Sequence, residues 1–206
     1  MQGTVFISFQ NGLGNEELIA SLVGEKKVLG GLTAQGANVE GPGHIRAHTD
    51  LASWLGEMDG EDTERVRQLC QLLTQHGLPC EASQQIRKQI WCKLLYNLAV
   101  SPMSTLTDLS LREVFETPGS RQVANLLVTE GLAVAAAEGV NIPTEEADHI
   151  LQKVPAWSLE ILPNNLPIEV IASRQENKTS MCVDVLKQRQ SEVDFINGRV
   201  VALAKK

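Results

Sequence analysis

The sequence predicts an α+β protein that is mostly α-helical, and three features support this fold class. A β-branched and aromatic segment near the N-terminus is followed by a glycine-bearing turn and a short helix, which is the order found in an α/β layer. Beyond about residue 82 no convincing strand pattern occurs, and apolar segments with helical spacing fill the remainder. We therefore predict two domains, a mixed α/β part over residues 1–82 and an all-helical part over residues 83–206.

The composition is that of a globular protein and argues against several functional classes. Apolar residues make up 43% of the 206 residues, and 18 basic against 25 acidic side chains give a net charge of −7. An acidic chain without a basic cluster is a poor match for nucleic acid or an anionic membrane. The apolar runs fall short of the ~20 residues that span a bilayer, and the first residues lack the pattern of a signal peptide. We expect a cytoplasmic protein that binds neither nucleic acid nor membrane.

The cysteines and histidines do not form a metal-site pattern. The four cysteines contain no Cys-x-x-Cys pair, and the four histidines show no ligand spacing with Cys, Asp or Glu. We expect buried free thiols in a reducing compartment, and we assign no metal site.

The predicted elements of the first part alternate between strand and helix. Residues 4–9 indicate a strand, residues 10–15 a sharp turn, and residues 16–23 a short helix with Asn15 as its N-cap. Two further short strands are expected at residues 27–32 and 44–48. A helix should run from Asp62 or Thr63 to about His76, where Gly77 ends it.

The turn at residues 10–15 has two interpretations. Turns between a strand and a helix often face a ligand at the carboxyl edge of a sheet. The spacing is not GxGxxG, however, because Glu17 stands three residues after Gly14. A plain strand-to-helix turn therefore remains an alternative.

The second part is predicted to consist of helices. The first covers residues 83–99 and ends near Pro102, and a short helix and loop follow at residues 106–115. Residues 120–138 are apolar nearly all round, so we place this helix in the core. A further helix should start at Pro143, residues 155–167 should be irregular, and one last helix should cover residues 178–204 with an apolar seven-residue repeat.

Within the helix at residues 90–102, Lys93, Asn97 and Ser101 stand four residues apart and so share one face. One interpretation is an amphipathic surface helix whose polar stripe meets water. The other is a lysine that faces a cleft, with an amide and a hydroxyl beside it to orient a small polar substrate. Lys93 is the only charged residue from Ile90 to Thr107, which favours partial burial, where a charge needs a partner or a task.

Three segments together resemble the ketopantoate reductase (2-dehydropantoate 2-reductase) family. The first is QNGLGN at residues 10–15, which is similar to that family's QNG turn. The second is IRKQIWCKLLYNLAVSP at residues 86–102, which matches a helix of pattern WxKLxxN. The third is KTSMCVDVLKQRQSEVDFING at residues 178–198, which resembles SSMxxD followed by TEIDxING. The three segments keep one register over nearly the whole chain.

The resemblance implies a fold, an activity and a cofactor. The fold would be a partial Rossmann-type segment followed by a helical domain like the C-terminal domain of 6-phosphogluconate dehydrogenase. The activity would be NADPH-dependent reduction of 2-dehydropantoate to (R)-pantoate in pantothenate and coenzyme A biosynthesis. The partner would be a small 2-oxo acid, and homodimerisation through the helices is left open.

The same register assigns roles to individual residues. Lys93 corresponds to the family's catalytic lysine, which gives a proton to the ketone oxygen as hydride reaches the carbon. Hydride addition produces an alkoxide far more basic than an ammonium of pKa ~10.4, so a protonated lysine is a competent acid. The substrate-binding candidates are Asn97, Ser101 and Ser180, and the cofactor-binding candidates are Asn11 and Glu192.

The sequence also departs from the family pattern. Ser101 stands where the family usually has a second substrate-binding asparagine, and Ser110-Leu111 replaces a common Asn-Gly. GxGxxG is absent, so we expect the phosphate-binding loop to be missing from this sequence. Two alternatives therefore stay open: a related reductase of another 2-oxo acid, and a catalytically inactive remnant or helical oligomerisation module.

Overall fold

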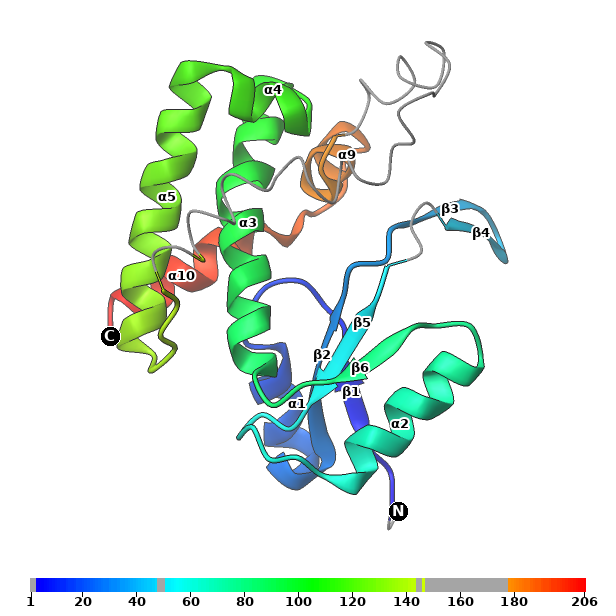
Figure 1. The fold of residues 1–206 in the computed structure, drawn as a ribbon. Helices are drawn as coiled ribbons and strands as arrows, with labels where there is room; N and C mark the ends of the chain where they lie inside the picture. The colour runs from blue at the N-terminus through cyan, green and yellow to red at the C-terminus, as the bar shows by residue number, and fades with distance from the viewer. Residues whose placement is uncertain (1–2, 48–50, 144–145, 147–177) are drawn as a thin grey trace. The chain divides into compact units, whose positions relative to one another are not determined.

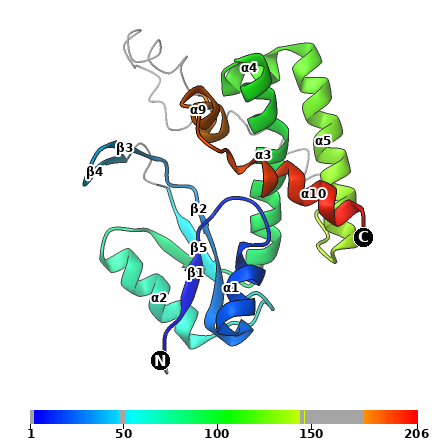
Figure 2. The same cartoon turned by 180° about the vertical axis from the view of Figure 1, so that it is seen from behind.

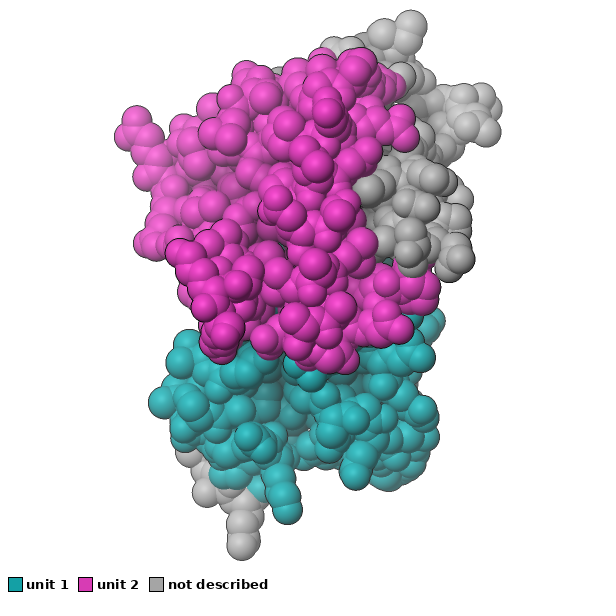
Figure 3. Space-filling view, turned by 90° about the vertical axis from the view of Figure 1, so that its left-hand side faces the viewer, with its two compact units in different colours: residues 1–90 teal, residues 91–206 magenta. Residues whose placement is uncertain are grey.

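The computed structural model describes residues 3–47, 51–143, 146 and 178–206. They belong to two compact units, residues 1–90 (unit 1) and 91–206 (unit 2), which Figure 3 shows in different colours. Strands among the described residues occur in unit 1, and unit 2 is helical. The predicted fold class is therefore confirmed. The division falls inside helix α3 (Ile86–Thr107), and the predicted domain limits of 1–82 and 83–206 stay a prediction.

Unit 1 is built on a four-stranded mixed sheet in the order β1-β2-β5-β6. β1 is parallel to β2 and β5 is parallel to β6, whereas β2 and β5 are antiparallel. Helices α1 (Asn15–Val23) and α2 (Glu64–Gln75) flank the sheet (Figures 1 and 2). The strands are β1 (Phe6–Ser8), β2 (Val28–Thr33), β5 (Ser53–Gly56) and β6 (Cys80–Ala82). β1 and β2 confirm the first two predicted strands, although β1 is shorter than predicted.

The remaining strands show what local sequence patterns leave out. β3 (Ala37–Gly41) and β4 (His44–Ala47) form a separate antiparallel hairpin, of which the sequence predicts only the second strand. β5 and β6, with four and three residues, are not predicted either. Runs this short carry little periodicity, and pairing with neighbouring strands makes them part of the sheet.

The core of unit 1 lies between the sheet and α2. Leu29 and Leu55 from the strands are fully buried and pack with Val66 and Cys70, which are one turn apart on α2. A short 3-10 helix, η1 (Glu25–Lys27), leads from α1 into β2. Thr63 is the N-cap residue of α2, as predicted.

The start of α1 differs from the prediction. Gly14, and not Asn15, is the N-cap, and Gly14 has a left-handed conformation with φ of 94°. Glycine enters this region without the steric penalty that a Cβ brings. Asn15 is the first helical residue, and its side-chain amide donates to the Asn11 carbonyl at 3.1 Å. Asn15 thus holds the preceding turn instead of capping the helix.

In unit 2, α3 continues through Pro102 to Thr107, so the predicted helix end at this proline is wrong. Proline has no N–H to donate to the carbonyl four residues earlier, that of Leu98. The side chain of Asn197 supplies a donor instead, with its Nδ2 at 3.2 Å from the Leu98 oxygen. Tertiary structure thus provides the hydrogen bond that the helix lacks.

The next two helices pack against each other and against α3. α4 (Leu111–Glu116) begins with a capping box formed by Ser110 and Glu113, which confirms the short helix predicted in this region. α5 (Pro118–Ala137) buries a single stripe of small residues, namely Ser120, Ala124, Val128, Gly131 and Ala135. The opposite face is exposed at Val123 and Leu126. The predicted burial all round this helix is therefore wrong.

The single last helix predicted over residues 178–204 is also wrong. The chain forms α9 (Ser180–Leu186), the 3-10 helix η2 (Glu192–Asp194) and α10 (Asn197–Ala204). The helix breaks where Gln188 adopts a left-handed φ of 55°. Of the predicted apolar repeat, Cys182, Ile196 and Leu203 are buried, whereas Leu186 is exposed. The helix expected to start at Pro143 and the irregular stretch at residues 155–167 fall on segments outside the described residues.

Close contact between α5 and α3 gives a test of this packing. A Cβ at Gly131 would lie 2.5 Å from Leu95 Cδ2 and 2.8 Å from Leu98 Cδ2. We expect Gly131→Val to destabilise the protein by about 1–3 kcal/mol in urea unfolding because the added methyl groups overpack a buried contact. Ala136→Val, at an exposed position of α5 away from Leu126 on the helix, is the matched control, with a loss below about 1 kcal/mol from helix propensity. Equal urea midpoints for the two variants would contradict the close packing of Gly131 against Leu95 and Leu98.

Candidate active site

The candidate catalytic face lies on α3, where Lys93, Asn97 and Ser101 follow at four-residue spacing. Lys93 and Asn97 are partly buried, and Ser101 is 4% exposed. Leu94 and Leu98 on the other sides of the helix are buried in the core. A polar stripe with so little exposure does not fit a solvated surface face. The burial argues against the solvated-face interpretation, and the substrate-facing role of these side chains stays a prediction.

The Lys93 ammonium is subject to two opposing influences. Burial is the stronger, and it lowers the pKa of Lys93 from the ordinary lysine value because a desolvated ammonium favours its neutral form. The carboxylate of Glu192 attracts the ammonium and raises the same pKa. Glu192 begins η2, near the opposite end of unit 2 in sequence. The structure therefore places the Glu192 carboxylate within electrostatic range of the Lys93 ammonium.

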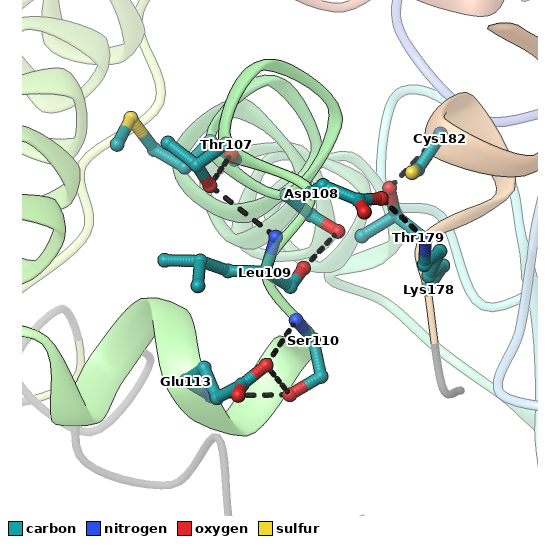
Figure 4. A network of polar contacts seen from close by, with 10 residues as sticks. Thr107, Asp108, Leu109, Ser110, Glu113, Lys178, Thr179 and Cys182 are labelled. Atoms are coloured by element: carbon teal, nitrogen blue, oxygen red, sulfur yellow. Dashed lines mark hydrogen bonds and ion pairs between the residues drawn. The ribbon is translucent and has the colours of Figure 1, made fainter. Parts of the chain in front are cut away.

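Ser180 lies at the start of α9, and Figure 4 shows how this start is held. Thr179 is the N-cap, and its hydroxyl accepts from the Cys182 N–H at 3.2 Å. Lys178 forms an ion pair with Asp108 in the loop after α3. Ser180 is therefore not the N-cap of α9. It is the first residue of the helix and is exposed.

The loop that receives Lys178 is itself tied to α3 and α4. Ser104 Oγ donates to the Leu109 carbonyl at 2.7 Å, and Ser110 N donates to Glu113 Oε2 at 2.8 Å (Figure 4). Asp108 has a positive φ of 59°, which aspartate tolerates better than most residues. The ion pair thus links α9 to a loop with a fixed local structure.

Asn11 belongs to unit 1, in the turn that follows β1. Asn11 is partly buried, and its backbone carbonyl accepts from the Asn15 side chain. Gly12 and Gly14 on either side of Leu13 both have positive φ. The turn leaves the carboxyl end of a parallel strand pair, where α/β proteins commonly bind ligands. The cofactor-binding role of Asn11 stays a prediction, with which this position is compatible.

The thiols and acidic groups do not form a metal site in the described part of the chain, where no three His, Cys, Asp or Glu side chains converge. None of the four cysteines, all of which lie among the described residues, forms a disulfide; Cys70 and Cys182 are buried as predicted, whereas Cys80 and Cys92 are only partly buried. The Sγ atoms of Cys70 and Cys80 lie 3.4 Å apart, and burial raises the pKa of Cys80 to about 12, which disfavours a reactive thiolate. None of the described helices is long and apolar enough to cross a bilayer.

The fold and these residues define a chain of the class that joins a Rossmann-type α/β segment to a helical domain. Within that class, the family "Ketopantoate reductase PanE/ApbA C terminal" matches residues 85–206, and "Ketopantoate reductase PanE/ApbA" matches residues 1–60. The chain belongs to the ketopantoate reductase PanE/ApbA family. The resemblance identified from the three sequence segments is therefore confirmed.

Individual relatives agree with this assignment. The 2-dehydropantoate 2-reductase of Archaeoglobus fulgidus is 32% identical over 197 residues, which cover 96% of this chain and 60% of that protein. The crystal structure of 2-dehydropantoate 2-reductase from Geobacter metallireducens GS-15 has a TM-score of 0.82 at 26% identity, covering 98% of this chain and 62% of that one. D-mandelate dehydrogenase with NADH shares the fold, with a TM-score of 0.83 at 22% identity, covering 100% and 64%. The chain spans about three fifths of the length of these relatives.

The desolvation of the Lys93 ammonium predicts an effect on the free energy of unfolding. Because the pKa of Lys93 is lowered by folding, the charged side chain opposes folding at neutral pH. We expect Lys93→Met to raise the stability in urea by about 0.5–2 kcal/mol. This penalty is fully present below the folded pKa of Lys93 and vanishes as the pH rises through the unfolded value of ~10.4, so the gain should shrink at alkaline pH.

Two controls accompany this measurement. Lys205→Met removes an exposed lysine and should change the stability by less than about 0.5 kcal/mol. Glu192→Gln should destabilise the wild-type chain, because it removes the carboxylate that favours the ammonium, but should have little effect beside Lys93→Met. A Lys93→Met variant less stable than the wild type would show that the ammonium makes a net favourable contribution.

Proposed function

We propose that this protein acts as a 2-dehydropantoate 2-reductase, reducing 2-dehydropantoate to (R)-pantoate with NADPH. The observation that carries the proposal is the partly buried Lys93 on α3, in electrostatic contact with Glu192. Family membership and the names of the relatives in Archaeoglobus fulgidus and Geobacter metallireducens support the substrate.

The chemistry assigned to Lys93 follows from its environment. A bound nicotinamide cofactor would supply the hydride, and the ketone oxygen would become an alkoxide. The Lys93 ammonium lies on a desolvated face, where its charge stabilises a developing oxyanion more than it would in water. Burial lowers the pKa of Lys93, so the ammonium is a stronger acid than free lysine, and Glu192 favours the protonated state that an acid requires.

The other predicted site residues take binding roles in this proposal. Asn97 and Ser101 follow Lys93 on the same helix face and would hold the polar groups of the 2-oxo acid. Ser180 would contact its carboxylate, and Asn11 would contact the cofactor. NADPH is proposed by family membership, whereas the D-mandelate dehydrogenase neighbour was solved with NADH. The four free thiols support a reducing, cytoplasmic location.

Turnover of NADPH with 2-dehydropantoate tests the proposal. We expect the wild-type protein to consume NADPH only when the 2-oxo acid is present. Lys93→Ala should lower kcat by about 10²–10⁴-fold, because it removes the general acid. Lys205→Ala, at an exposed position, is the matched control and should leave kcat unchanged.

Each other outcome decides against part of the proposal. Turnover by Lys93→Ala near the wild-type rate would remove the lysine from the mechanism. A higher kcat/KM with another 2-oxo acid would favour a related reductase. Absence of both NADPH binding and turnover in the wild-type protein would favour the inactive helical module.

We also propose a homodimer through the exposed face of α5. Val123 and Leu126 on α5 are 42% and 57% exposed, and Val201 on the contacting helix α10 is 52% exposed. Apolar side chains gathered on neighbouring helices are typical of an interface between subunits. One ketopantoate reductase with the same fold, from Staphylococcus aureus, is described as dimeric.

Sedimentation measurements test the dimer. We expect the wild-type chain to sediment as a dimer and Leu126→Glu as a monomer, because the new carboxylate would be buried in the interface. Leu186→Glu, at a similarly exposed leucine on α9, should remain dimeric. A monomeric wild-type chain, or loss of the dimer in both variants, would contradict this interface.

A further inference from the structure

We propose that Asn197 is a positioning residue of the candidate active site, which holds the catalytic turn of α3 by replacing the hydrogen bond that Pro102 removes. The inference rests on the proposed function for its catalytic consequence. Its structural part stands on contacts within unit 2 alone.

The first step concerns the gap that Pro102 creates. α3 continues for five residues beyond this proline, so the Leu98 carbonyl lies inside a helix but has no N–H at position 102 to bond with. Leu98 is 3% exposed, so water does not readily take the place of that donor. A buried carbonyl without a donor is unfavourable by an amount comparable to a lost hydrogen bond.

The second step concerns the group that fills the gap. Asn197 Nδ2 donates to the Leu98 oxygen at 3.2 Å, across 99 residues of sequence. The donor orientation of this amide follows from chemistry, because a carbonyl can accept but cannot donate. The Asn197 Oδ1 is buried without a hydrogen-bond partner among the described residues. The N–H of the Asn197 amide is therefore the part of this side chain that makes a hydrogen bond to the protein.

The third step excludes an ordinary capping role. Asparagine near a helix start is usually an N-cap. Here Asn197 is the first helical residue of α10, the N-cap is Ile196, and no side-chain cap bond is present at this helix start. The amide thus serves α3 and not its own helix.

The fourth step links the bond to the catalytic groups. Leu98 directly follows Asn97 and lies between Lys93 and Ser101, so the bond fixes α3 in the middle of the stretch of about two turns that carries all three candidates. On the other side, Ile196 is 2% exposed and its N–H donates to the Glu192 carbonyl at 3.1 Å. The same short segment therefore connects Glu192 to α3. Loss of the amide should shift Glu192 and Lys93 relative to each other.

A double-mutant cycle tests the inference. Asn197→Ala removes the amide, Pro102→Ala restores an N–H that can bond to the Leu98 carbonyl, and the double variant combines the two changes. We expect Asn197→Ala to lower the urea midpoint. It should also lower kcat by about 10–100-fold with a smaller change in KM, because misplaced catalytic groups mainly slow the chemical step. In the Pro102→Ala background the same substitution should lower the urea midpoint clearly less. Asn141→Ala, at an exposed asparagine beyond the end of α5, is the matched control and should change neither quantity.

A second readout does not depend on turnover. NMR titration of the Lys93 side chain should give a lower pKa in Asn197→Ala than in the wild type, because Glu192 no longer lies close enough to favour the ammonium. If the wild-type protein reduces no 2-oxo acid but this shift and the stability coupling are observed, the proposed function fails and the positioning role stands. Additive stability effects, or an unchanged Lys93 titration in Asn197→Ala, would overturn the positioning role. Should Asn197→Ala alone fail to fold, the double variant provides the test: folding restored by Pro102→Ala supports the positioning role, and a double variant that also fails to fold would overturn it.

Discussion

The partly buried ammonium of Lys93 is the charged group around which the candidate site of the helical unit is arranged. A desolvated charge is unfavourable unless an opposite charge lies nearby, and here the partner is Glu192 from the far end of the chain. The C-terminal segment returns to α3, where the Asn197 amide donates to the Leu98 carbonyl. A straight helix over the 27 residues 178–204 would extend roughly 40 Å. The observed break near Gln188 instead allows both Cys182 and Ile196 to be buried.

Two further contacts stabilise α3. Pro102 leaves the Leu98 carbonyl without its usual donor, and the Asn197 amide occupies that position. Gly131 leaves room on α5 for the methyl groups of Leu95 and Leu98, so that the two helices approach closely. Both arrangements act on the stretch of α3 that carries the candidate site residues. Packing and polar satisfaction thus fix the same part of α3 on which the proposed chemistry depends.

The correctly predicted elements have strong local patterns. A few neighbouring residues are enough to show the β-branched run at β1, the cap and apolar stripe of α2, and the apolar faces of α3. The wrong predictions concern segments whose structure is set by contacts with distant parts of the chain. β5 and β6 become strands by pairing, α5 is half exposed despite its apolar sequence, and Pro102 is accommodated by a residue far along the chain. Composition and propensity carry no information on such partners.

The sequence alone determined the fold class, the family and the spacing that places Lys93, Asn97 and Ser101 on one helix face, because helical periodicity relates residues a few positions apart. Only the tertiary structure decided that Glu192 lies within electrostatic reach of Lys93 and that Asn197 bonds to Leu98. Contacts between residues about one hundred positions apart depend on which surfaces the folded chain buries together, and no local period encodes that choice.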